Sequence, residues 1–435
     1  MQKSLKVSAT GDSLFVADIP AEYDNDMKAV TSFIDDCDVR ITNLETNISK
    51  FGEFPNAYSG GTWLNTEPHV FDDLTKYGFN YYGTANNHCM DYSYHGLLST
   101  IDELDKRGLA HSGTGRSLEQ ASAPAVIDAS GTKVAIIAVT TEFNLASKAG
   151  PKTIYLDGRP GVNYVGCERY YQIDKDKLEV LKQIADDTNI NATRNLSIKG
   201  GFILPDPDGI FNFGEIKFCY DGTKKNTECN KKDKDRLVRS IKKAKEENDY
   251  VLVLIHCHHV KKDVHCEVPE FLEELSHACI DAGASAMIGG GTHELRGIEI
   301  YKGCPIFYSL GDFIYQGMRV PILPADFMEK YGIDINSTGY EGLMARSKGG
   351  KIGLQAHKCN FMSVVPKMEF EDGKLKSLIM MPTVAGFDRE GKMAGLPYHA
   401  KGEESKQIFD VLVKLSNEYG TELVMSDNII ELKIK

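Results

Sequence analysis

Residues 251–259 read Val251-Leu252-Val253-Leu254-Ile255-His256-Cys257-His258-His259. The first five residues form a continuous apolar run, which is typical of a β-strand buried on both faces of a sheet. Imidazole side chains follow at His256 and His258, directly where the predicted strand ends. The stretch therefore predicts a buried strand that presents polar side chains at its carboxyl end.

Strands, polar turns and helices alternate on both sides of this stretch. Further strands are expected at residues 5–9, 39–45, 79–83, 133–139, 286–288 and 305–310. Helical spacing of apolar residues predicts helices at residues 71–77, 94–107 and 271–282. A glycine follows each of these helices, as is common at helix ends. This alternation predicts an α/β fold through roughly the first 300 residues.

We expect a single domain over residues 1–435 that is interrupted by two insertions. Residues 150–234 are rich in Gly, Pro, Asn, Asp and Lys, and residues 319–358 also break the pattern, as a lid would. From about residue 361 the chain is expected to continue as strands, a helix at 403–419 and a last strand at 428–433. The two insertions are expected to shape the substrate site.

Composition excludes several classes of function. The chain has 435 residues, with 50 Lys and Arg against 62 Asp and Glu, and its net charge is −12. An acidic surface repels phosphate backbones, so we expect no nucleic-acid partner. The motifs of serine hydrolases (Gly-x-Ser-x-Gly) and of P-loop NTPases (Gly-x-x-x-x-Gly-Lys-Ser/Thr) do not occur.

The cellular setting is predicted from what the sequence lacks. No apolar stretch approaches the ~18 residues that cross a bilayer, and residues 1–9 are too short an apolar run for a signal peptide. We therefore expect no transmembrane segment and a soluble, cytoplasmic protein. The ten cysteines include no Cys-x-x-Cys pair, which favours reduced, buried thiols over a zinc ribbon or a disulfide framework.

Polar residues follow directly after several predicted strands. In an open α/β sheet the strand ends meet in one crevice, so these side chains are expected to lie together. Carboxylate, amide and imidazole groups suit Mn²⁺, Fe²⁺ or Zn²⁺. Turn or helix capping is the alternative for Asp12 and for Asn87 with His88. The candidate residues are Asp12, Glu45, Asn87, His88, His256, His258 and His293. Arg296 is a further candidate, either to hold a substrate carboxylate or as a plain surface charge.

Several of these runs resemble the CapA family, the poly-γ-glutamate capsule-biosynthesis proteins. The resemblance extends from about Val7 to Phe313. That family is similar to the calcineurin-like metallophosphoesterases, which implies a four-layer fold of two stacked β-sheets flanked by helices. The matching runs are Gly11-Asp12, Asn43-Leu44-Glu45, Ala85-Asn86-Asn87-His88 with Asp91, His256-Cys257-His258, Gly289 to His293 with Leu295-Arg296-Gly297, and Tyr308 to Phe313.

The resemblance also implies roles for the candidate residues. Asp12 and His293 would bind a first metal, Asn87 and His256 would bind a second, and Glu45 would bridge the two. The implied chemistry is hydrolysis by a metal-bound water, because a divalent ion lowers the pKa of that water from 15.7 toward ~7.

Two further roles concern residues beside the metals. His88 would lie beside the substrate, oriented by Asp91, and His258 is an additional candidate ligand. One or two divalent ions are expected, and the implied substrate is acidic or peptide-like.

Three positions depart from the family's pattern and leave other functions open. Leu14 stands where a histidine is expected, the turn before His293 lacks a histidine and carries Thr292 in place of proline, and His259 replaces a frequent glutamate. The leading hypothesis is a metal-dependent hydrolase of a peptide, a poly-γ-glutamate-type polymer or a phosphoester. The alternatives are a peptide or amino-acid epimerase that uses Asp12 and His293 as its acid/base pair, and a non-catalytic partner in capsule or polymer biosynthesis.

Overall fold

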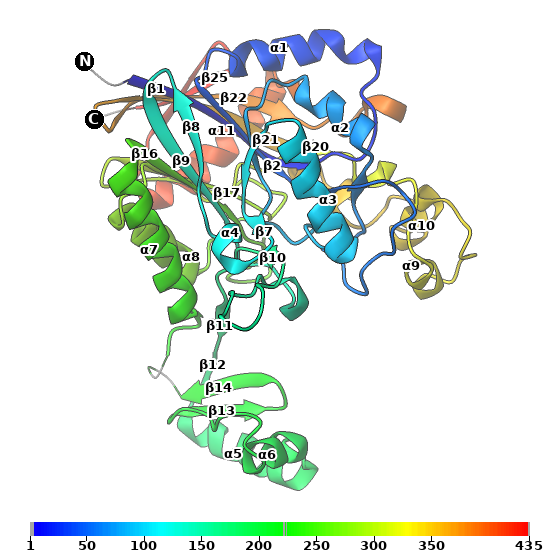
Figure 1. Cartoon of the computed structure of the whole chain (residues 1–435), viewed down its shortest axis with the longest axis vertical. Helices are drawn as coiled ribbons and strands as arrows, with labels where there is room; N and C mark the ends of the chain where they lie inside the picture. The colour runs from blue at the N-terminus through cyan, green and yellow to red at the C-terminus, as the bar shows by residue number, and fades with distance from the viewer. Residues whose placement is uncertain (1–3, 221, 223, 434–435) are drawn as a thin grey trace.

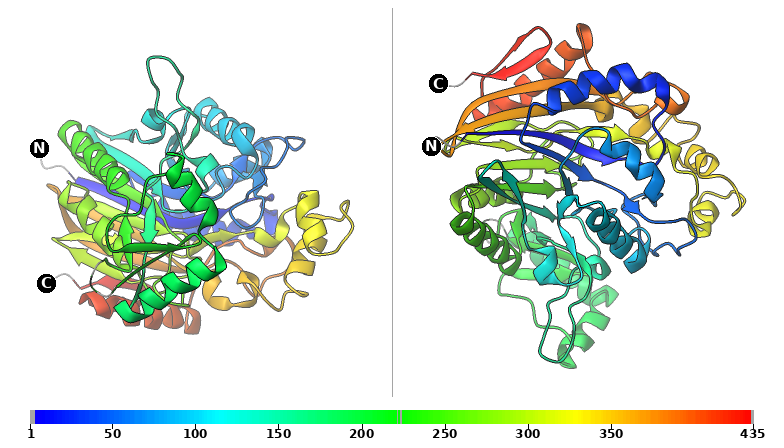
Figure 2. Two further views of the ribbon diagram at one scale, coloured as in Figure 1. Left: turned by 90° about the horizontal axis from the view of Figure 1, so that it is seen from below. Right: turned by 45° about the horizontal axis from the view of Figure 1, so that its top comes forward.

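Two large β-sheets lie face to face in the computed structural model, which describes residues 4–220, 222 and 224–433 (Figures 1 and 2). Over these residues the first sheet has ten strands and the second has six. One core cluster lies between the sheets, and two others lie between a sheet and the helices outside it. This four-layer arrangement confirms the predicted α/β fold class.

The first sheet is built around β1 (Ser4–Leu14). β1 runs parallel to its neighbours β2 and β20 and antiparallel to β21. The strands follow in the order β24 (Leu423–Ser426), β25 (Ile429–Leu432), β22 (Lys374–Val384), β21 (Met362–Glu371), β1, β2 (Val39–Leu44), β5 (Tyr81–Gly83) and β6 (Ala110–Ser112). In addition, β20 (Asp312–Tyr315) pairs with β1, and β23 (Tyr398–His399) pairs with β22.

The second sheet is built around β16 (Tyr250–His256), which is parallel to both of its neighbours. Its strands follow in the order β18 (Ile298–Tyr301), β19 (Cys304–Phe307), β17 (Ala286–Gly290), β16, β9 (Thr132–Thr140) and β8 (Ala125–Ala129). The carboxyl ends of β9, β16 and β17 therefore lie at the same edge of the sheet.

The apolar run of β16 is buried on both faces because alternate residues enter different cores. Leu252 and Leu254 pack between the two sheets. Val251, Val253 and Ile255 pack in the core that the second sheet shares with two helices. These helices are α7 (Lys231–Glu247) and α8 (Glu270–Asp281). The continuous hydrophobic pattern of the strand follows from this double burial.

Helices also cover the first sheet and the side openings between the sheets. α1 (Asp24–Ile34) and α2 (Pro68–Thr75) contribute to the core on the outer face of the first sheet. α11 (Glu403–Ser416) contacts both β18 and β22, and α3 (Ser93–Lys106) contributes to two of the cores. The shorter elements of the body are β3 (Asn47–Ile48), β4 (Asn65–Thr66), β7 (Thr114–Gly115), α4 (Leu118–Ala121) and β10 (Gly161–Val162).

A small lobe projects from the body at one end of the molecule (Figure 1). Its base is a two-stranded ladder in which Cys167 faces Cys229, formed by β11 (Cys167–Arg169) and β15 (Thr227–Cys229). The lobe itself contains β12 (Tyr171–Ile173), α5 (Lys175–Thr188), α6 (Ala192–Lys199), β13 (Ile210–Phe213) and β14 (Ile216–Tyr220). The lobe contains a shorter stretch of chain than the insertion predicted at residues 150–234, because β10, near the start of that stretch, pairs with β7 in the body.

A second excursion lies beside the body and contains α9 (Ala325–Lys330) and α10 (Gly339–Arg346) (Figure 1). After it, β21 and β22 form a long antiparallel pair of the first sheet. Among the described residues, no helix combines the length and the apolar character that a bilayer span requires.

A close backbone approach places Asp12 at the edge between the sheets. The backbone N–H of Asp12 donates to the carbonyl of Gly311 at 3.2 Å. A Cβ atom on Gly11 would lie 1.7 Å from that same carbonyl oxygen. Glycine at position 11 therefore lets the loop before β20 reach β1.

Replacing this glycine is expected to disturb the whole sheet. Gly11→Ala should lower the free energy of unfolding by about 2–3 kcal/mol, because the methyl group would force β1 and Gly311 apart. Urea denaturation followed by circular dichroism measures this change. Gly166→Ala is the matched control, since its Cβ would meet no atom closer than 3.3 Å. Equal denaturation midpoints for Gly11→Ala and the native chain would contradict the prediction.

Candidate metal centre

The carboxyl ends of strands from both sheets bring the predicted ligands together. One ligand atom from each of Asp12, Glu45 and His256 lies within 4.8 Å of the others. The same holds for Glu45, His258 and His293. Asp12 lies in β1, Glu45 directly follows β2, and His256 ends β16. Residues that are far apart in the sequence thus form two adjoining ligand groups that share Glu45.

Glu45 is the central residue of the site. Its side chain is fully buried, and neither carboxylate oxygen has a hydrogen-bond partner among the described residues. Burial raises the pKa of Glu45 well above its usual value, and the nearby Asp12 and Asp312 carboxylates raise it further. A buried carboxylate without donors is unfavourable unless a cation or a proton compensates it. The donor set around Glu45 therefore fits a divalent cation.

Two imidazoles and an amide oxygen converge beside Glu45. The Nε2 atom of His256 lies 2.6 Å from Oδ1 of Asn87 and 3.0 Å from Nε2 of His258. Asn87 donates from its Nδ2 atom to the Gly60 carbonyl at 2.9 Å, which turns its Oδ1 atom toward the histidines. Burial and the neighbouring histidines hold the pKa of His258 well below its usual value. A neutral imidazole is the form that binds metal ions.

Asp12 is held in place through both carboxylate oxygens. Asn43 donates from Nδ2 to Oδ1 at 2.6 Å, and the Gly291 backbone N–H donates to Oδ2 at 2.6 Å. Burial alone would raise the pKa of Asp12, but His256 and the other contacts outweigh burial and lower it. A Cβ atom on Gly290 would lie 2.5 Å from Oδ1 of Asp12. This contact gives a physical reason for the run of glycines in the turn before His293.

His293 has an unusual backbone conformation, with φ at +61°. Its Nδ1 atom lies 3.0 Å from Oδ2 of Asp312, which is fully buried at the start of β20. Burial opposes protonation of His293, but Asp312 outweighs burial and raises the pKa of the imidazole. Burial in turn raises the pKa of Asp312 to about 6. A strained non-glycine residue in a buried ion pair is typical of functional sites.

Asp312 and Asn43 are site residues that the sequence analysis did not select. Asp312 follows the predicted strand at 305–310, in the same kind of position as Asp12 and Glu45, so a sequence signal was present. Asn43 does not follow a strand, because it lies inside β2, and its signal was its place in the Asn43-Leu44-Glu45 run that resembles the family; in the structure it contacts Asp12 and His256.

His88 forms a second imidazole–carboxylate pair at this site. Its Nδ1 atom lies 2.6 Å from Oδ2 of Asp91. Asp91 also accepts hydrogen bonds from the backbone N–H groups of Gly60 and Leu64, at 2.9 and 2.8 Å. The carboxylate is thereby fixed, and it orients the His88 ring with Nε2 3.8 Å from Oε1 of Glu45.

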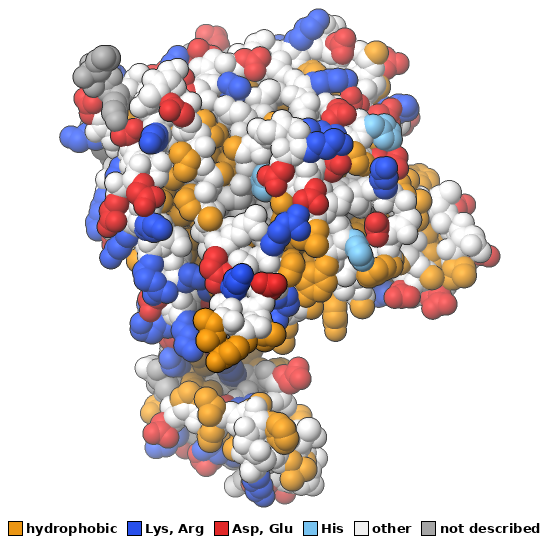
Figure 3. All heavy atoms as spheres, viewed as in Figure 1, with side chains coloured by type: hydrophobic (Ala, Val, Ile, Leu, Met, Phe, Trp, Pro, Cys, Tyr) orange, Lys and Arg blue, Asp and Glu red, His pale blue; other side chains and the backbone are white. Residues whose placement is uncertain are grey.

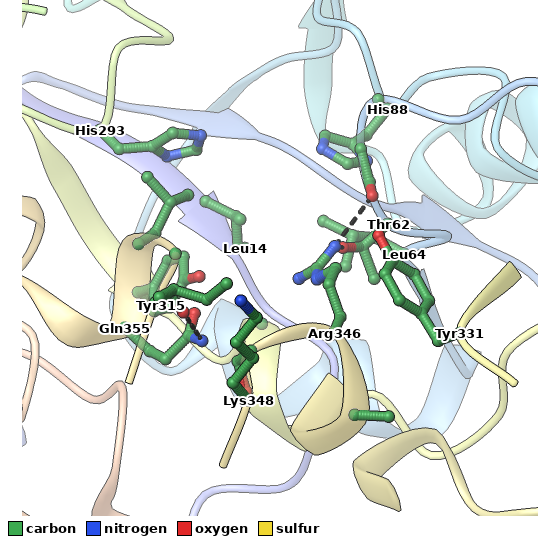
Figure 4. A pocket seen from close by; sticks show the side chains of 18 residues that line it. Leu14, Thr62, Leu64, His88, His293, Tyr315, Tyr331, Arg346, Lys348 and Gln355 are labelled. Atoms are coloured by element: carbon green, nitrogen blue, oxygen red, sulfur yellow. Dashed lines mark hydrogen bonds between the residues drawn. The ribbon is translucent and has the colours of Figure 1, made fainter. Parts of the chain in front are cut away.

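A cavity of about 600 Å³ opens beside these residues. Of the site residues described above, His88, His293, Gly60 and Leu64 line it. Figure 4 shows His88 and His293 on one side, with Arg346 and Lys348 facing them from the other. Further walls come from several residues of the 345–355 segment and from Leu14, Gly61, Thr62, Tyr315, Gly317 and Tyr331.

Arg296 lies elsewhere than the sequence analysis expected. Its side chain is fully buried, with Nε donating to the His265 carbonyl at 2.8 Å and Nη2 to the His259 carbonyl at 2.7 Å. The guanidinium therefore supports the backbone of an irregular loop and does not line the cavity. His259, the residue that departs from the family's pattern, forms an ion pair with Glu142.

A solved structure with partial similarity is a Staphylococcus aureus protein assigned as a 5′-nucleotidase, in complex with α-ketoglutarate. It aligns with a TM-score of 0.39 and 10% sequence identity over 94% of this chain and 58% of its own. A similarity at this score does not establish a shared fold, and the site described above stands on its own geometry.

Sequence comparisons assign this chain to a protein family. The y4sH protein of Sinorhizobium fredii is 30% identical over 97% of this chain and 91% of its own length. The PGA biosynthesis protein CapA of Bacillus subtilis is 24% identical over 58% of this chain and 47% of its own. Residues 6–317 match the family described as bacterial capsule synthesis protein PGA_cap. The match covers most of the chain and contains all the candidate ligand residues above, so this chain belongs to the PGA_cap family.

Proposed function

We propose that this protein is a metal-dependent hydrolase. The observation that carries the proposal is the buried Glu45 carboxylate, which has no hydrogen-bond donor among the residues that the structure describes and is shared by two candidate ligand groups. One or two ions such as Mn²⁺, Fe²⁺ or Zn²⁺ suit these oxygen and nitrogen donors. The residues proposed to hold them are Asp12, Glu45, Asn87, His256, His258 and His293.

The proposed chemistry divides between the ions and the two imidazoles at the cavity. A bound divalent ion supplies a water of lowered pKa and polarises the bond under attack. His88 would transfer a proton between its Nε2 atom and the leaving atom, because Asp91 holds the opposite ring nitrogen. Asp312 would orient the His293 ring through its Nδ1 atom, as Asp91 does for His88.

The proposed substrate is a peptide, a poly-γ-glutamate-type polymer or a phosphoester. The name of the Bacillus subtilis relative, a PGA biosynthesis protein, supports the polymer. The size of the cavity, about 600 Å³, supports a ligand of several small units.

The geometry favours hydrolysis over epimerisation. An epimerase would need Asp12 to reach a Cα–H group of the substrate. Asp12 does not line the cavity, and both of its oxygens already accept hydrogen bonds. These contacts suit a metal ligand better than a proton-transferring base.

Metal binding should depend on Glu45. The full chain, purified without chelator, should contain a divalent ion by elemental analysis. After EDTA treatment, added Mn²⁺ or Zn²⁺ should raise the melting temperature of the native chain by several degrees. Glu45→Gln should remove this response. Without metal the variant should be at least as stable as the native chain, because it lacks the buried negative charge.

The control for this measurement is Glu390→Gln, which changes an exposed carboxylate outside the site. This variant should respond to metal as the native chain does. If the native chain neither retains an ion nor gains stability from one, the proposed metal centre does not exist.

Proton transfer should depend on His88. With metal supplied, His88→Asn should lower kcat by about 10²–10⁴-fold toward bis(4-nitrophenyl) phosphate or a γ-linked glutamate peptide. Its metal content should stay unchanged. Asp91→Asn should have a smaller effect on kcat and should shift the pH profile, because the ring loses its orienting carboxylate.

The matched control is His95→Asn, since His95 lies on the exposed side of α3, where it contacts Phe54. Hydrolysis by this variant should equal that of the native chain. A metal-loaded native chain that cleaves neither substrate would instead favour the non-catalytic alternative.

A further inference from the structure

The cavity wall opposite His88 and His293 comes from the segment that follows α10 (Figure 4). After Arg346 the chain turns sharply, with positive φ angles at Lys348, Gly349 and Gly350. Lys348 is the non-glycine residue of this turn, with φ at +50°. A left-handed lysine is uncommon. Here the turn carries the lysine side chain to the cavity.

Arg346 and Lys348, the two cations of this wall, differ in their side-chain contacts. Arg346 donates from Nη1 to the Gly61 carbonyl at 3.0 Å and to Oγ1 of Thr62 at 2.7 Å, which connects the segment to the opposite wall. The backbone N–H of the exposed Lys348 donates to the Ala345 carbonyl at 3.3 Å, but its side-chain ammonium group has no hydrogen-bond or ion-pair partner among the described residues. The N–H groups of this ammonium are therefore available to a ligand in the cavity.

The charge of the cavity differs from that of the chain. The chain has a net charge of −12. Among the described residues that line the cavity there is no Asp or Glu, whereas Arg346 and Lys348 both line it. A pocket lined by one sign of charge concentrates ligands of the opposite sign. This contrast indicates that the ligand carries negative charge on the side away from His88 and His293.

Apolar and aromatic side chains also line the cavity. They include Leu14, Leu64 and Tyr315, and Figure 4 shows Leu14 between His293 and Lys348. These surfaces suit the carbon skeleton of a ligand, with polar groups at its two ends.

We propose that Lys348 and Arg346 form an anion subsite that determines substrate specificity. The substrate then carries a carboxylate or phosphate group, separated by a short carbon skeleton from the bond that is cleaved. The inference rests on the proposed function for the position of that bond at His88 and His293. The anion subsite itself requires no metal ion.

Calorimetric titration of the full chain, as purified and again after EDTA treatment, tests this subsite. The probes are glutarate, methyl phosphate and the uncharged glutaramide. At least one anion should bind, and glutaramide should bind about tenfold more weakly or not at all. Lys348→Gln should weaken binding of the anion about fivefold, as expected for one charge-assisted contact. The anion that binds more tightly identifies the group as carboxylate or phosphate.

Lys351→Gln is the matched control, because Lys351 is an exposed cation of the same segment that does not line the cavity. Its affinity for the anion should stay within twofold of the native value. Equal binding by Lys348→Gln and the native chain would overturn the proposal, as would equal binding of glutarate and glutaramide or no binding of either anion. Anion binding that persists after EDTA treatment in a chain without hydrolytic activity would retain the subsite and reject the hydrolase.

Discussion

The free energy of a buried, donor-free carboxylate is the constraint on which the site depends. Glu45 is fully buried, which raises its pKa, and the Asp12, Asp312 and Asp91 carboxylates raise that pKa further. Such an arrangement is unfavourable in a folded protein unless positive charge compensates it. The cationic or potentially cationic groups within 4.0 Å of the Glu45 carboxylate, among the described residues, are the imidazoles of His88 and His256, and no Lys or Arg is among them. The missing compensation has the chemistry of a divalent ion, which links the stability of the site to its proposed function.

The fold satisfies this constraint by close backbone packing at the strand ends. Gly11 lets the Gly311 loop reach β1, and Gly290 lets the turn after β17 reach the Asp12 carboxylate. A side chain at Gly11 would force β1 away from the loop before β20 within the first sheet, and a side chain at Gly290 would force the second sheet away from Asp12. The same backbone contact supplies the N–H of Gly291 to Asp12, so the turn that excludes a side chain also fixes a carboxylate. Packing and electrostatics are therefore set by the same glycines.

The fold and the clustering of most candidate ligand residues could be predicted from the sequence because both follow local rules. The apolar run at 251–255 marks a strand buried on both faces, and polar residues after such strands mark the common edge of an α/β fold. Asn43 could not be found in this way, since it contacts Asp12 only after β1 and β2 pair. The burial of Arg296 could not be predicted either, because the neighbouring sequence does not distinguish a buried guanidinium from one at the surface. Its partners are backbone carbonyls of a distant loop.

The two imidazole–carboxylate pairs have different positions relative to Glu45, and this difference supports the different roles proposed for them. His293 belongs to a ligand group with Glu45 and His258, whereas His88 belongs to neither group and lies 3.8 Å from Glu45. Each ring is oriented through Nδ1 by its own buried aspartate. If His293 held an ion through its other ring nitrogen, as proposed, that nitrogen would not be available to carry a proton to the substrate. His88 lines the cavity and belongs to neither ligand group, which supports the proposal that proton transfer is the role of His88.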